Sequence, residues 1–109
     1  MPDSFIIVLI TAPSRQVAES IARQLVESKL AACVNILPSV RSIYTWEGAV
    51  QEEDEVLLLV KSRAELFHQR LVPAVRAMHP YEVPEIIALP VLMGSEPYLD
   101  WLRASTAAS

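Results

Sequence analysis

Apolar residues along the chain follow two repeating patterns, one typical of strands and one typical of helices. Residues 5–10 form a short apolar, β-branched run, which predicts a strand buried on both faces. Ser14, a residue type that caps helices, precedes apolar residues that recur at helical spacing over 17–26. A second helical pattern covers residues 64–78, and Pro73 inside it is expected to kink or break the helix. The chain therefore begins with a strand and a helix, and a second helix follows later.

Two long extended segments, residues 31–46 and 49–62, lie between these helices, and Gly48 marks the turn between them. A strand of sixteen residues reaches roughly 50 Å, whereas a domain of this size has a radius of gyration of only about 13 Å. Such a hairpin must bend, and Pro38 is the expected position. Because long bare strand edges promote association, the hairpin either projects or pairs with a neighbouring copy. Its length predicts an oligomer without giving the number of subunits.

The last predicted elements are a strand over residues 83–92, interrupted by Pro90, and a short helix that starts at residues 95–97. The tail from Ala104 is expected to fray. The order strand, helix, strand, strand, helix, strand is that of a ferredoxin-like sandwich. We therefore predict a single domain over residues 1–109 with an α+β, ferredoxin-like βαββαβ fold, a long β-hairpin and an extra C-terminal helix.

Composition and charge exclude several classes of partner. The net charge is −4 and the nine Lys and Arg residues are scattered, which argues against a nucleic-acid partner. Only two glycines are present, so a Gly-rich phosphate loop is excluded. The apolar runs are far shorter than the roughly 18 residues of a membrane span, and no basic residue precedes the first of them as in a secretory signal. A single cysteine excludes an internal disulfide, and we expect a cytoplasmic protein with no membrane partner.

A histidine, a tyrosine and two carboxylates lie close together in a segment that two prolines make rigid. The segment consists of His79, Pro80, Tyr81, Glu82, Val83, Pro84 and Glu85. Each proline restricts its own backbone and that of the residue before it, and rigid polar loops commonly carry function. The apolar residues that follow would anchor the loop to a sheet. This loop is the first candidate for a functional site.

Cys33 is the only soft metal ligand in the chain. Copper or zinc would combine its thiolate with imidazole nitrogen, and His79 and His68 are the two histidines available. A cysteine in an apolar strand is more often a small buried hydrophobe, and these residues lack a ligand-like spacing, so both interpretations stay open. His68 lies within a helical pattern among polar residues and is left outside the site.

Five of the thirteen acidic residues gather around the hairpin turn, namely Glu47, Glu52, Glu53, Asp54 and Glu55. Strand alternation places Glu53 and Glu55 on one face and Glu52 and Asp54 on the other. A solvated strand edge that discourages aggregation is favoured here over a dedicated cation site, although hard cations would be attracted weakly. Four large aromatic residues, Tyr44, Trp46, Tyr81 and Trp101, line a cleft or belong to the core or a subunit interface.

The sequence shows no credible pair of nucleophile and base, so we expect no enzyme activity. A small enzyme would require a cleft that brings His79 and Glu85 within hydrogen-bond reach. Lys61, a lone cation at the end of an apolar run, pairs with an acid such as Glu85 or points at an anionic ligand.

Five sequence blocks together resemble the CutA divalent-cation-tolerance family. They are residues 31–36 (AACVNI), 42–48 (SIYTWEG), 53–55 (EDE) leading to Lys61, 79–85 (HPYEVPE) and 98–102 (YLDWL). The resemblance covers residues 5–103 and implies a ferredoxin-like subunit in a very stable homotrimer, with hairpin strands that pair between subunits. It also implies a link to tolerance of copper and other divalent cations.

Members of that family are similar in carrying a cysteine and a histidine at the positions of Cys33 and His79. Some members have a further cysteine where this chain has Ile10, which argues against a thiolate-rich site. We therefore predict a homotrimer with no obligatory cofactor that binds copper(II) or another divalent cation weakly near subunit clefts. Its ligands would be Cys33, His79, Glu82 and Glu85.

The alternative hypothesis is a trimeric signalling protein like the PII proteins, which share the subunit fold. Such a protein would bind a small anionic ligand in the cleft between subunits. Lys61, Tyr81 and Trp101 would line that cleft. Fold analogy alone supports this alternative.

Overall fold

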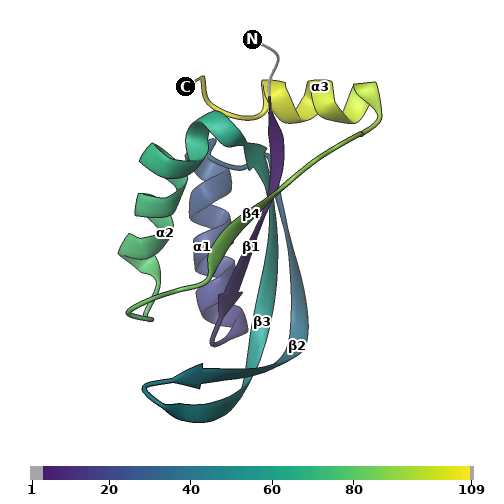
Figure 1. Cartoon of the computed structure of the whole chain (residues 1–109). Helices are drawn as coiled ribbons and strands as arrows, with labels where there is room; N and C mark the ends of the chain where they lie inside the picture. The colour runs from purple at the N-terminus through teal and green to yellow at the C-terminus, as the bar shows by residue number, and fades with distance from the viewer. Residues whose placement is uncertain (1–3, 109) are drawn as a thin grey trace.

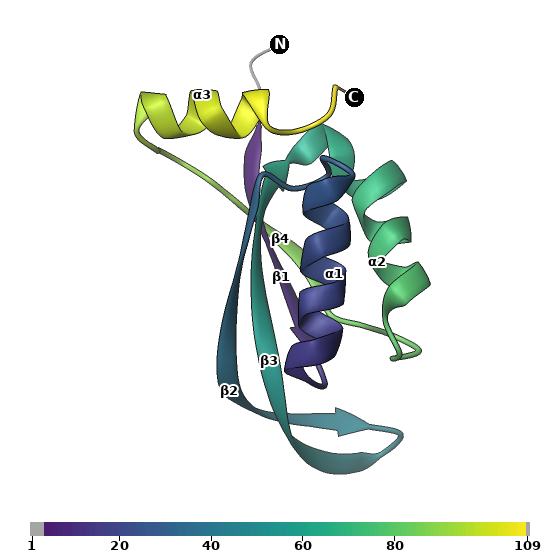
Figure 2. The ribbon, with the colours of Figure 1, turned by 180° about the vertical axis from the view of Figure 1, so that it is seen from behind.

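Four antiparallel strands form one sheet, and two helices cover one of its faces (Figures 1 and 2). The computed structural model describes residues 4–108. The strands are β1 (Phe5–Ala12), β2 (Cys33–Trp46), β3 (Ala49–Arg63) and β4 (Ile86–Pro90), in the spatial order β2-β3-β1-β4. The helices are α1 (Arg15–Glu27), α2 (Val72–Met78) and α3 (Glu96–Ala104). The predicted ferredoxin-like fold, with its long hairpin and added C-terminal helix, is confirmed.

The core lies between the sheet and the helices α1 and α2. In β1 the buried residues alternate with half-buried ones, so that Val8 and Ile10 face the helices while Ile7 and Leu9 face the other way. The prediction that this strand is buried on both faces is therefore wrong for a single subunit, because both helices pack on the same face of the sheet. We call the uncovered face the open sheet face. Its apolar members are Ile7, Leu9, Leu37, Leu57, Leu59, Ile87 and Leu89, which the strand register places side by side.

The hairpin of β2 and β3 extends beyond the body of the subunit and curls at its end (Figure 1). Its register shifts between Leu37 and Val40. Pro38 cannot donate a hydrogen bond to a neighbouring strand, and Ser39 has a positive φ of 66°, so the chain forms an irregularity there. The predicted bend is confirmed, and the subunit measures 44 × 26 × 23 Å.

The second helical segment is divided, as Pro73 predicts. A 3₁₀ turn (Ala64–Leu66) and a π-helical turn (Phe67–Leu71) precede α2, which carries Pro73 at its start. Proline lacks the N–H of a regular helical turn, and its ring would clash with the carbonyl of Gln69, so the preceding turn widens. Helix α2 is thereby short, and it ends where His79 begins the polar loop.

Strand β4 is shorter than predicted, since it starts at Ile86 rather than at residue 83. The three residues before it belong to the loop instead, because Pro84 lacks the N–H that a strand needs. The strand ends at Pro90, where the sequence predicted an interruption. Within residues 4–108, no helix is long and apolar enough to span a membrane.

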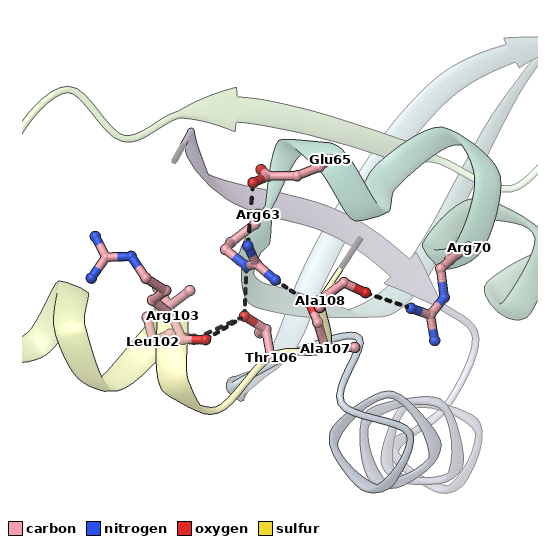
Figure 3. A network of polar contacts seen from close by, with 8 residues as sticks. All are labelled: Arg63, Glu65, Arg70, Leu102, Arg103, Thr106, Ala107 and Ala108. Carbon is pink, nitrogen blue, oxygen red and sulfur yellow. Dashed lines mark hydrogen bonds and ion pairs between the residues drawn. The ribbon is translucent and has the colours of Figure 1, made fainter. Parts of the chain in front are cut away.

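Residues 105–108, which follow α3, are held by hydrogen bonds, contrary to the prediction that the tail frays (Figure 3). The last residue, Ser109, lies outside the described residues. The guanidinium of Arg63, which is 7% exposed, donates from Nε to Thr106 Oγ1 at 2.8 Å and from another nitrogen to the carbonyl oxygen of Ala107. Its Nη1 forms an ion pair with Glu65 Oε2 at 3.2 Å. The N–H of Ala107 also donates to the carbonyl oxygen of Lys29 at 2.8 Å. A buried arginine needs acceptors, and the tail supplies them.

Replacing Thr106 by valine should destabilise the protein by about 1–3 kcal/mol, because the buried Nε of Arg63 then loses its acceptor. The free energy of unfolding in urea measures this loss. Thr45→Val, the same change at an exposed position of the hairpin, is the matched control and should cost less than about 0.5 kcal/mol. Equal losses in the two variants would show that the tail does not stabilise the fold.

Candidate functional site

A cleft of about 650 Å³ opens between the curled end of the hairpin and the loop that joins α2 to β4, two segments that lie near each other in both views (Figures 1 and 2). Strand β1 contributes Thr11 to it. The hairpin contributes Ser42, Ile43, Tyr44, Trp46, Glu53 and Glu55, and the loop contributes Tyr81, Glu82, Val83 and Glu85. Three predicted site residues of the loop, Tyr81, Glu82 and Glu85, therefore meet the acidic part of the hairpin.

His79 attaches the start of this loop to strand β1. Its side chain is buried, and its Nε2 lies 2.7 Å from the carbonyl oxygen of Thr11. A carbonyl oxygen only accepts, so we assign the ring proton to Nε2. The other ring nitrogen, Nδ1, accepts from the backbone N–H of Tyr81 at 3.2 Å. The single lone pair of Nδ1 is thus occupied by the Tyr81 N–H, and a cation could bind Nδ1 only after that hydrogen bond opens, whereas the bond to Thr11 could remain.

Tyr81 connects the loop to the hairpin. Its hydroxyl donates to Glu55 Oε2 at 2.7 Å, and its ring lies 4.7 Å from the ring of His79, measured between centroids. Burial raises the pKa of Tyr81 well above its usual range, and the hydrogen bond and charge of Glu55 and the charge of Glu53 raise it further. Glu55 itself is 7% exposed although it belongs to the acidic cluster. The loop and the hairpin are therefore held together by a half-buried phenol and a buried carboxylate.

The acidic cluster divides between the two faces of β3 as strand alternation predicts. Arg41 pairs with Glu52 and with Asp54, both at 3.2 Å, and all three side chains are exposed. Glu53, which accepts from the hydroxyl of Tyr44, and Glu55 instead line the cleft. The interpretation as a solvated edge therefore holds for Glu52 and Asp54 only. Glu53 and Glu55 lie on the same face of β3 as Leu57 and Leu59, which is the face opposite the helices. This alternation was the sequence signal for their position.

Cys33, Lys61 and Trp101 lie at the other end of the sheet. Cys33 pairs with Lys61 in the strand register, and the Lys61 ammonium donates to Asn35 Oδ1. Helix α3 is close to them, since burial and the neighbouring Cys33 raise the pKa of Tyr98. The Trp101 ring lies 5.5 Å from that of Tyr98.

One chain by itself does not bring the predicted residues together as one site. Lys61 pairs with Ile7 of β1, whereas His79 contacts Thr11, four residues further along that strand and thus roughly 13 Å away. Cys33 is therefore distant from His79, and Lys61 from Tyr81. Among residues 4–108, no three His, Cys, Asp or Glu side chains converge as a metal site. Within this range the ring nitrogens of His79 bond to Thr11 and Tyr81 and not to Glu85.

Comparisons with known proteins give a consistent result. Residues 6–105 match the family model described as CutA1 divalent ion tolerance protein. The Divalent-cation tolerance protein CutA of Thermus thermophilus is 56% identical over 100 residues, which cover 92% of this chain and 96% of that protein. Human Protein CutA is 47% identical over 106 residues, and the chain spans 59% of its length.

Solved structures give the same result. A divalent cation tolerance protein (Cut A1) from Thermus thermophilus has a TM-score of 0.91 at 54% identity, with 94% of this chain and 99% of that chain covered. CutA1 from Oryza sativa has a TM-score of 0.93 at 44% identity, with 97% and 96% covered. The similarity includes the hairpin and α3, since nearly the whole of each chain is matched.

Tyr81→Phe should destabilise the protein by about 1–3 kcal/mol at neutral pH, because the buried Glu55 loses its hydrogen-bond donor. The pKa of Tyr81 is higher in the folded state than in the unfolded state, so this group contributes to stability. The contribution is fully present below the unfolded-state pKa of about 10 and is lost as pH rises towards the folded-state pKa. Part of the loss of stability above pH of about 10 should therefore disappear in this variant. Urea unfolding at several pH values measures both effects.

Tyr44→Phe, which removes a hydroxyl from the exposed side of the same cleft, is the control for this experiment. It should cost less than Tyr81→Phe at neutral pH. An unchanged dependence of stability on alkaline pH in Tyr81→Phe would contradict the role given to the hydroxyl that bonds to Glu55.

Proposed function

Because the chain belongs to the CutA1 family of divalent ion tolerance proteins, we propose that it acts as a homotrimer that binds copper(II) or another divalent cation weakly between subunits. The observation that carries this proposal is the open sheet face, which makes assembly favourable. The proposed role is binding rather than catalysis, and the single cysteine supports a cytoplasmic location. No obligatory cofactor is part of the proposal.

The open sheet face has the character of an interface. Ile87 and Leu89 at the β4 edge are 49% and 48% exposed, and β1 and β3 add half-buried leucines beside them. Contiguous apolar surface of this kind marks sites of protein association. Leu92 and Met93, which follow β4, are more than four-fifths exposed and extend the apolar surface. A closed ring of identical chains would cover this surface without leaving a free copy of it.

Assembly also supplies what one subunit lacks for cation binding. The candidate ligands lie at two ends of the sheet, with Cys33 near α3 and with His79, Glu82 and Glu85 at the polar loop. A head-to-tail ring places one end of a subunit beside the other end of the next. The exposed carboxylates of Glu82 and Glu85, and His79 Nδ1 once its bond from the Tyr81 N–H opens, would then be joined by the Cys33 sulfur of a neighbour. Sulfur, imidazole and carboxylate together suit copper(II) better than magnesium or calcium.

An anionic ligand, the alternative hypothesis, gains no support from the cleft described above. Tyr81 lies beside Glu55 and Glu53, which would repel an anion. Lys61 bonds to Asn35 at the other end of the sheet, and Trp101 lies on α3. Binding of an anion by these three residues stays a prediction that depends on the assembly.

Isothermal titration with copper(II) tests the cation site. The unmodified chain should bind copper with an affinity that falls as pH falls, since protons compete for the ligands. Cys33→Ala and His79→Ala should each weaken binding by about tenfold or more, the loss of roughly one good ligand. His68→Ala, which removes the exposed histidine outside the site, is the matched control and should leave binding unchanged. Unchanged affinity in the Cys33→Ala, His79→Ala double variant would overturn the proposed ligand set.

A further inference from the structure

We draw no further inference here: the strongest candidate, the surface groove between α1 and the edge strand β2, whose apolar lining residues are Ala22, Val26, Val34 and Ile36, carries none because nothing in the structure shows what covers it.

Discussion

The fold depends on one imbalance: a sheet that is apolar on both faces has its helical cover on only one of them. Helices α1 and α2 pack against the same face, and they bury Val8, Ile10 and Leu58 completely. The other face presents leucines and isoleucines on four adjacent strands. Burial of apolar surface is the main favourable term in folding and association, so contact with further copies, as proposed, would stabilise this face. The proposed assembly would also cover the projecting hairpin and bring the separated candidate ligands of two copies together.

Buried polar groups give the functional regions their shape. His79 holds the polar loop to β1 through Thr11, and Tyr81 holds it to β3 through Glu55. At the other end, Arg63 binds the C-terminal tail (Figure 3). Buried polar groups that lack partners are costly, so each of these contacts restricts its segment to one arrangement. The cleft between the hairpin and the loop exists because the loop is fixed in this way.

Local features of the sequence predicted most of the fold. Pro38 predicted the bend in β2, Pro73 the interruption before α2, and alternation in β3 the division of the acidic cluster. The resemblance to the CutA family and the element order both gave the ferredoxin-like topology. These features succeed because proline geometry and strand periodicity act within a few residues.

Contacts between residues that are far apart in the chain could not be predicted from the sequence. The bond between His79 and Thr11 joins residues 68 positions apart, and the bond between Arg63 and Thr106 joins residues 43 apart. Neither spacing nor composition specifies such pairs, so the docked tail was missed. The grouping of Cys33 with Lys61, rather than with His79, follows from strand register, which depends on the whole sheet.

Sedimentation equilibrium of the unmodified chain at micromolar concentration measures whether the open sheet face is covered by other copies in solution. For a homotrimer we expect a mass of about 36 kDa, three times the 12.1 kDa of one chain. A single species at 12.1 kDa would contradict the proposed assembly, since the apolar face would then be stable in water without a partner.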